Sequence, residues 1–240
     1  MPVILITGSG RRLGRSLALD FARSDWDVGV HYNNSEREAI DTVKEIKKTG
    51  RRSYAVKADL THSDEVRILF EEVINNLGIP SVLINNAGFY PLRKSIDETT
   101  DDDWENTFNI NLDAVFRCCR QFAKFAEENS RIINISSIGG LKYLKNRIPY
   151  SVSKAATIDL TKALAIELAP GISVNCICPG ALFLDETDLD SSKTMISPKK
   201  IPMLRYGTSS DVFDAAMFFA SSSNYITGQI LSVDGGLSII

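Results

Sequence analysis

The sequence predicts an α/β fold, with one doubly wound parallel sheet covered by helices on both faces. Short apolar runs rich in β-branched residues alternate with longer segments of helical periodicity. Most of the short runs lack the apolar–polar alternation of a half-exposed strand, which is typical of parallel strands buried on both faces. Strand and helix repeated in this order indicate right-handed crossovers within a single sheet.

The pattern assigns elements along the whole chain. The expected strands are Val3–Ile6, Asp27–His31, Ser53–Lys57, Val82–Ile84, Arg131–Ile135, Ser173–Ile177 and Ile230–Val233. The expected helices are Leu13–Ser24, Glu36–Thr49, Ser63–Leu77, Trp104–Asn129, Tyr150–Leu168 and Ser210–Ser221. No repeat or Pro/Gly/Ser-rich linker divides the chain, so residues 1–240 are expected to form one domain. The poorly patterned stretch 181–206 is expected to be a substrate lid, because long loops in compact domains are usually functional.

Composition argues against several classes of protein. The formal net charge is −3, so no surplus of positive charge is available for nucleic-acid phosphates. The four cysteines form a vicinal pair and a Cys-x-Cys, spacings that do not match a metal site, and buried reduced thiols are expected instead. A signal-peptide pattern and a long apolar run are both absent. These features predict a soluble cytoplasmic protein with no membrane or nucleic-acid partner and no metal.

A glycine-rich turn follows the first expected strand and opens the first expected helix. Glycines allow close backbone approach to a pyrophosphate, and the helix N-terminus adds donors and partial positive charge. Gly14 falls one residue later than in the usual dinucleotide-binding spacing, and an ordinary strand–helix turn is the alternative. The residues assigned here to a cofactor in a Rossmann-type domain are Gly8, Ser9, Arg11, Arg12 and Leu13.

The end of the second strand favours NADP(H) over NAD(H). NAD-binding domains place an acid about 20 residues after the turn, where it holds the ribose hydroxyls. This chain has Asn33, Asn34 and Ser35 there, which can donate to a 2′-phosphate, while Arg11 and Arg12 add cationic donors. The alternative is a solvated polar loop.

A phenol and an ammonium lie four residues apart at the start of the long expected helix 150–168. Tyr150 and Lys154 therefore share one helix face. A nearby cation favours the phenolate and moves the tyrosine pKa toward the working range of a proton donor. Ser137, after the fifth expected strand, could hydrogen-bond a substrate carbonyl while Tyr150 delivers the proton.

These motifs resemble the short-chain dehydrogenase/reductase family over essentially the whole chain. The matching landmarks are Thr7-Gly8 with Gly14, Asp59-Leu60, Asn85-Asn86-Ala87-Gly88, Asn111, Ser136-Ser137, Tyr150 with Lys154, Pro179-Gly180 and Val233–Gly236. The resemblance implies that Tyr150 is the acid/base, that Ser137 polarises the carbonyl and that Asn111 holds a water for a proton relay. It assigns Lys154 to the nicotinamide ribose and to lowering the Tyr150 pKa.

The resemblance also extends the cofactor site and implies an assembly. Asp59 with Leu60, Asn86 with Ala87 and Gly88, and Pro179 with Gly180 join the cofactor set. Family members commonly form homotetramers through the two long helices, so a homo-oligomer, tetramer or dimer, is expected.

The Gly-Arg-Arg-Leu-Gly turn is similar to the pteridine-reductase branch of the family. Arg12 stands where most members have glycine, and Phe89 follows the Asn-Asn-Ala-Gly turn. The resemblance makes Arg12 and Phe89 candidates to hold a flat pterin, with Ser137 and Tyr150 completing the substrate site. Parasitic pteridine reductases have aspartate where this chain has Ser137, which keeps simple ketone reduction open. Phe89 could equally be a loop anchor.

The expected function is NADPH-dependent reduction of a small carbonyl or pterin-like substrate by hydride transfer. The alternative within the family is a 3-oxoacyl-[acyl-carrier-protein] reductase, which needs a basic rim for its acidic partner. Glu127 and Glu128 before the fifth strand argue against that reading, as do the acidic lid residues Asp185, Glu186, Asp188 and Asp190. The non-enzyme alternative is an NADP(H)-sensing binding protein, for which an intact Ser137, Tyr150 and Lys154 would be unnecessary.

Overall fold

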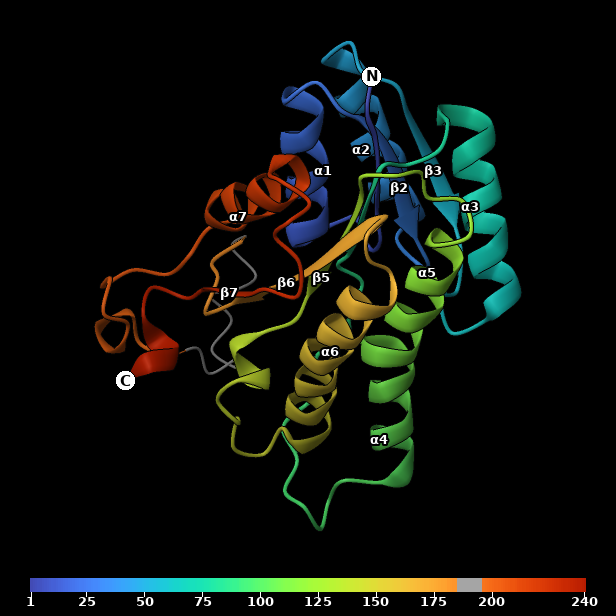
Figure 1. Ribbon diagram of the computed structural model, residues 1–240. Coiled ribbons are helices and arrows are strands. Elements are labelled where there is room, and N and C mark those ends of the chain that lie inside the picture. The colour runs from blue at the N-terminus through green and yellow to red at the C-terminus, as the bar shows by residue number, and fades with distance from the viewer. Residues whose placement is uncertain (185–195) are drawn as a thin grey trace.

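The computed structural model describes residues 1–184 and 196–240, arranged around one parallel sheet (Figure 1). Its strands are β1 (Val3–Ile6), β2 (Asp27–Tyr32), β3 (Ser53–Lys57), β4 (Val82–Asn85), β5 (Ser130–Ile135), β6 (Ile172–Pro179) and β7 (Ile230–Val233). They pair in the order β3-β2-β1-β4-β5-β6-β7. The doubly wound fold class predicted from the sequence is confirmed.

Helices cover both faces of the sheet (Figure 1). One layer contains α1 (Arg12–Arg23), α2 (Glu36–Lys48) and α7 (Ser209–Ser221), and the other contains α3 (Ser63–Leu77), α5 (Ala114–Phe122) and α6 (Ile148–Glu167). Strand β1 shows why the strands read as continuous apolar runs. Ile4 and Ile6 pack in the core under α1, while Val3 and Leu5 pack in the core under α3, so every residue of β1 is buried.

The helix expected over Trp104–Asn129 is wrong at both ends, and the helix that forms contains a π-helical turn that the pattern did not predict. The structure has α4 (Asp101–Phe108), a π-helical turn over Asn109–Asp113 and α5, which ends at Phe122. A capping box between Thr100 and Asp103 begins α4 three residues before the expected start. After Phe122 the chain turns to enter β5 beside β4, with Asn129 at a φ of 67°. Single-turn π segments are frequent at functional sites.

Part of the expected lid can be followed. Leu182 forms an isolated parallel bridge with Gly207, which joins the two ends of the 181–206 stretch to each other. Ile201, within the stretch, is buried and packs in the interior. Residues 185–195, including Asp185, Glu186, Asp188 and Asp190, lie outside the described residues.

The topology collects the predicted motifs at one edge. In a parallel sheet all carboxyl ends of the strands lie at the same edge, and the chain winds away in opposite directions from β1 and β4, which are neighbours. The turns after β1, β2, β3, β4, β5 and β6 carry the predicted residues. Glu127 and Glu128, in contrast, precede β5 and therefore lie toward the opposite, amino edge.

Candidate active site

A cavity of about 530 Å³ opens at the carboxyl ends of β1, β2 and β4. It brings together much of the predicted cofactor set: Gly8, Arg11, Arg12, Leu13, Asn33, Asn34, Ser35, Asn86, Ala87 and Gly88. Phe89, predicted to contact substrate, lines the same cavity, as does Glu38 from the first turn of α2. Glu38 is an acid that the sequence reading did not weigh. The described residues that line it do not include Ser9, Asp59, Leu60, Pro179 and Gly180, nor the predicted catalytic Asn111, Ser137, Tyr150 and Lys154.

The glycines of the first turn are required by close backbone contacts. Gly8 has a φ of 64°, a conformation that favours glycine, and a Cβ at this position would lie 2.9 Å from the Ala87 Cα. A Cβ on Gly14 would lie 2.3 Å from the Gly8 carbonyl oxygen and 2.5 Å from Asn86 Nδ2. The turn after β1 is therefore packed directly against the turn after β4.

Side chains of Thr7 and Asn86 join these two turns. The Thr7 hydroxyl accepts hydrogen bonds from the backbone N–H groups of Asn86 and Ala87, both at 3.0 Å. Asn86 Nδ2 donates to the carbonyls of Thr7 at 2.9 Å and Gly8 at 3.2 Å. Asn86 thus supports the glycine-rich turn by holding its backbone, and Thr7 is a positioning residue that could be recognised from its place before Gly8.

His31 is a second positioning residue that the sequence reading missed. Its Nδ1 accepts a hydrogen bond from the Gly8 N–H at 2.8 Å, and its Nε2 lies 3.0 Å from the Ala58 carbonyl oxygen. Burial lowers the pKa of His31 to about 4, although the Ala58 contact acts in the opposite direction. The imidazole is therefore neutral at pH 7, accepting at Nδ1 and donating at Nε2.

Ser9 and Asp59 take part in the structure of the neighbouring turns. The buried Ser9 hydroxyl donates to the Ile6 carbonyl at 2.7 Å and accepts from the His31 N–H at 3.1 Å. Asp59 accepts from the backbone and hydroxyl of Thr61 at 2.9 and 2.7 Å. Burial raises the pKa of Asp59, but hydrogen bonds from Thr61 and Asn33 and the charge of His62 outweigh it, so the pKa is lowered. The contact with Asn33 places Asp59 beside the end of β2.

Ser137 and Tyr150 meet at the end of β5. Ser137 caps the short 3-10 helix Ile138–Gly140, and its Oγ accepts from the Gly139 N–H at 3.0 Å. Burial raises the pKa of Tyr150 to about 12, against a hydrogen bond with Ser137 and the charge of Arg147, which both lower it. The phenol is therefore protonated at neutral pH, as a proton donor to a carbonyl requires.

Lys154 lies one helical turn beyond Tyr150 in the interior. Its Nζ donates to the Ile135 carbonyl oxygen at 2.9 Å, and burial lowers its pKa to about 8. Gly140 permits α6 to approach this loop, because a Cβ there would lie 2.7 Å from the Lys154 carbonyl carbon. Lys154 is not among the groups that lower the Tyr150 pKa in this arrangement, where Ser137 and Arg147 have that effect.

Asn111 lies in the π-helical turn and is fully buried. Its Oδ1 accepts from the Phe89 N–H at 2.7 Å, and its Nδ2 donates to the Phe89 carbonyl at 2.9 Å and to Ser153 Oγ at 3.1 Å. The amide therefore fixes the backbone of Phe89, at the mouth of the cavity, to helix α6. This contact connects the predicted catalytic residue with the predicted substrate residue.

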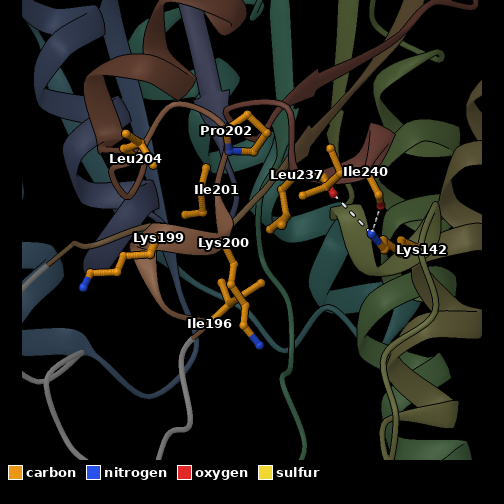
Figure 2. A pocket seen from close by; sticks show the side chains of 9 residues that line it. All are labelled: Lys142, Ile196, Lys199, Lys200, Ile201, Pro202, Leu204, Leu237 and Ile240. Carbon is orange, nitrogen blue, oxygen red and sulfur yellow. Dashed lines mark hydrogen bonds between the residues drawn. The ribbon is translucent and has the colours of Figure 1, made fainter.

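A second cavity, of about 480 Å³, lies beside the C-terminus (Figure 2). Lys142, Lys199 and Lys200 line it together with the apolar side chains of Ile196, Ile201, Pro202, Leu204, Leu237 and Ile240. Lys142 Nζ is occupied there, because it hydrogen-bonds to the Leu237 and Ile240 oxygens (Figure 2). None of the predicted catalytic residues is among the described residues that line this cavity.

All four cysteines are free and buried, as expected. Within residues 1–184 and 196–240, three or more His, Cys, Asp or Glu side chains nowhere gather in a way that could hold a metal ion. No helix in the described part of the chain has the length and apolar character needed to cross a membrane.

A family model described as "Enoyl-(Acyl carrier protein) reductase" matches residues 8–238. The chain belongs to the short-chain dehydrogenase/reductase family. It is therefore an oxidoreductase by family, and the resemblance inferred from the motifs is confirmed.

Named relatives and solved structures cover nearly the whole chain. A 3-oxoacyl-[acyl-carrier-protein] reductase FabG of Staphylococcus aureus is 36% identical over 97% of this chain and 96% of that protein. A blue fluorescent protein from a metagenomic library, solved in complex with NADPH, is 32% identical with a TM-score of 0.91, covering 98% of this chain and 97% of that one. A short-chain dehydrogenase from Burkholderia cenocepacia in complex with NADP is 30% identical with a TM-score of 0.89, over the same shares.

Proposed function

We propose that this protein is an NADPH-dependent reductase in which Tyr150 donates the proton to a substrate carbonyl. The observation that carries the proposal is the half-buried, protonated Tyr150 in hydrogen-bond contact with Ser137, with the buried Lys154 one helical turn further along α6. NADPH, when bound, supplies the hydride. Ser137 would polarise the carbonyl by donating a hydrogen bond, and Tyr150 would protonate the oxygen.

The lining of the 530 Å³ cavity fits an NADP-type dinucleotide. Only glycine fits at Gly8 and Gly14, so neither position carries a side chain that would keep a pyrophosphate away from the backbone of the turn. Arg11 and Arg12 offer cationic donors, and Asn33, Asn34 and Ser35 offer neutral ones at the end of β2. The NADPH and NADP complexes of the two structural relatives support this assignment.

The remaining predicted residues take supporting roles in this proposal. Lys154 would hold the nicotinamide ribose, Asp59 and Leu60 would flank the adenine, and Pro179 with Gly180 would close the nicotinamide end. Asn111 is proposed to hold the relay water. Its side-chain amide already bonds to Phe89 and Ser153, so it would exchange one of these contacts or act through its backbone.

A 3-oxoacyl thioester on an acyl carrier protein is the first candidate substrate. The printed activity of the Staphylococcus aureus relative supports it. Arg93 and Arg147, on the two loops beside Tyr150, also support it, whereas Lys94 is paired with Asp103 and Lys142 is bonded to the Leu237 and Ile240 oxygens. The acidic residues that argued against a carrier protein lie toward the other edge of the sheet or outside the described residues. An acidic partner is attracted to such a basic rim.

A substrate panel tests the proposal. NADPH oxidation is followed with acetoacetyl-carrier protein, acetoacetyl-CoA, a small diketone and a dihydropterin. The reductase proposal is supported if the wild type reduces any of these carbonyl compounds and Tyr150→Phe does not. A higher kcat/KM for acetoacetyl-carrier protein than for acetoacetyl-CoA identifies the carrier protein as the partner. Tight NADPH binding without turnover of any compound would replace the reductase by the NADP(H)-sensing alternative.

A pterin-like substrate is the second candidate, because Arg12 and Phe89 line the same cavity. Phe89 is 42% exposed, so its ring is accessible to a flat ligand. If the ring stacks on substrate, Phe89→Ala should raise KM for dihydropterins more than for aliphatic ketones. Leu92→Ala, on the same loop but 83% exposed, is the control. An equal loss for both substrate classes would leave Phe89 as a loop anchor.

We also propose that the protein is a homo-oligomer, tetramer or dimer, with no nucleic-acid partner and a cytoplasmic location. Large apolar side chains lie exposed on the helices predicted to assemble: Trp104 on α4, Phe116 on α5, and Val152 and Ile166 on α6. Exposed apolar patches of this kind mark interaction surfaces. Sedimentation of the wild type and of Phe116→Glu tests the assembly.

A further inference from the structure

An arginine lies next to the catalytic tyrosine with part of its guanidinium buried and unpaired. Arg147 Cζ sits 3.9 Å from the centroid of the Tyr90 ring. The Tyr90 ring in turn contacts the Tyr150 ring edge-to-face, with centroids 4.6 Å apart. One aromatic ring therefore touches both the guanidinium and the proton donor. No sequence signal marked this residue, which comes three positions before Tyr150.

Backbone hydrogen bonds fix the main chain at Arg147 and at the residue before it. The Arg147 carbonyl accepts from the Ser151 N–H at 2.9 Å in the first turn of α6, and the Asn146 carbonyl accepts from the Lys94 N–H at 3.1 Å. The second contact ties the loop before α6 to the loop that carries Tyr90. Stacking on Tyr90 adds a cation–π contact. Arg147 is thus positioned by two loops that flank Tyr150.

Its polar atoms lack the partners that burial normally requires. Nε and Nη1 are buried and have no hydrogen-bond partner among the described residues. Burial lowers the pKa of Arg147, and the charge of nearby Arg93 lowers it further. The side chain as a whole is half-buried, but charged donors removed from water are costly to leave without a partner, which an anion would supply. The second positive charge makes an anion still more favourable here.

We propose that Arg147 binds a carboxylate of the carbonyl substrate, so that the protein acts on oxo acids in preference to neutral ketones. The inference rests on the proposed reductase function, and it selects an oxo acid in place of the carrier-protein thioester, which has no free carboxylate. A guanidinium presents coplanar donors that match the two oxygens of a carboxylate, which an ammonium does not. A substrate anchored in this way would present its ketone to Tyr150 and Ser137.

Matched acid and ester substrates test the inference. NADPH-dependent kcat/KM is measured for pyruvate and acetoacetate and for their methyl esters, because the ester keeps the ketone and removes the charge. Arg147→Gln should lower the acid-to-ester ratio about 10- to 100-fold, mainly through KM, as expected for a lost charged hydrogen bond. Arg147→Lys should restore only part of the ratio. Lys145→Gln, which removes an exposed charge from the same loop, should leave it unchanged.

A binding measurement separates this inference from the reductase proposal. Acetoacetate is titrated into the NADP⁺-loaded wild type and Arg147→Gln by calorimetry, with NADPH affinity and thermal unfolding as controls for folding. Weaker acetoacetate binding in the variant supports the carboxylate site even if no ketone is turned over. The inference is overturned if acid and ester lose equally in Arg147→Gln, or if acetoacetate binds both proteins alike or neither.

Discussion

The imidazole Nδ1 of His31 accepts a hydrogen bond from the backbone N–H of Gly8 at 2.8 Å. The contact joins the end of β2 to the turn after β1, and it requires a neutral imidazole because Nδ1 must act as an acceptor. Because the Gly8 N–H donates to His31, this N–H stabilises the conformation of the turn.

Acid should therefore destabilise the protein through His31. The folded-state pKa of about 4 lies below the ordinary histidine pKa of 6.5, so the stabilisation is complete above about pH 6.5 and is lost as pH falls toward 4. Between about pH 7.5 and about pH 5 the wild type should lose about 2 kcal/mol of unfolding free energy more than His31→Gln. Urea unfolding at both pH values measures this. His62→Gln removes the exposed histidine and should lose as much as the wild type, and equal losses in all three proteins would refute the role of His31.

Gly14→Ala should disrupt the turn. Its Cβ would overlap the Gly8 carbonyl and the Asn86 amide, and overpacking of this kind costs about 1–3 kcal/mol. We expect lower thermal stability and at least about tenfold weaker NADPH binding, by fluorescence titration. Gly171→Ala is the matched control, because its nearest neighbour is 4.0 Å away. Unchanged NADPH affinity in Gly14→Ala would mean that the turn does not contact the cofactor.

Cofactor preference should depend on the charge at the end of β2. Asn33→Asp introduces an anion into the proposed 2′-phosphate site, beside Glu38 in the same cavity. The ratio of NADPH to NADH affinity should fall by about tenfold or more, because like charges a few ångströms apart repel by about 1–4 kcal/mol. Asn33→Ser keeps a neutral donor and should largely preserve the ratio. Wild-type preference for NADH would contradict the assignment outright.

Tyr150→Phe should lower kcat by about 10²–10⁴-fold while NADPH affinity stays near that of the wild type. The ring and its contact with Tyr90 remain, and only the proton donor is removed. Tyr143→Phe, at an exposed tyrosine of the preceding loop, is the control. Wild-type kcat in Tyr150→Phe, on a substrate whose chemical step limits the rate, would exclude Tyr150 as the donor.

Local pattern alone determined much of this protein. Short runs rich in β-branched residues allowed β1, β3 and β7 to be assigned to the residue, although only β1 of the three is buried on both faces. The i, i+4 spacing placed Tyr150 and Lys154 on one face of α6. The parallel order then placed the turns after β1, β2 and β4 at one edge. These inferences succeeded because periodicity and i, i+4 spacing depend on short stretches of chain, and because all carboxyl ends of a parallel sheet lie at one edge whatever the strand order.

Tertiary structure decided the rest. The π-helical turn at Asn109–Asp113 follows no local signal, and Asn111 there bonds to the distant backbone of Phe89. Neither the clamp of His31 on Gly8 nor the stacking of Arg147 on Tyr90 can be read from spacing, because each joins loops far apart in the chain. The raised pKa of Tyr150 likewise comes from burial by surrounding elements, and only packing in three dimensions determines burial.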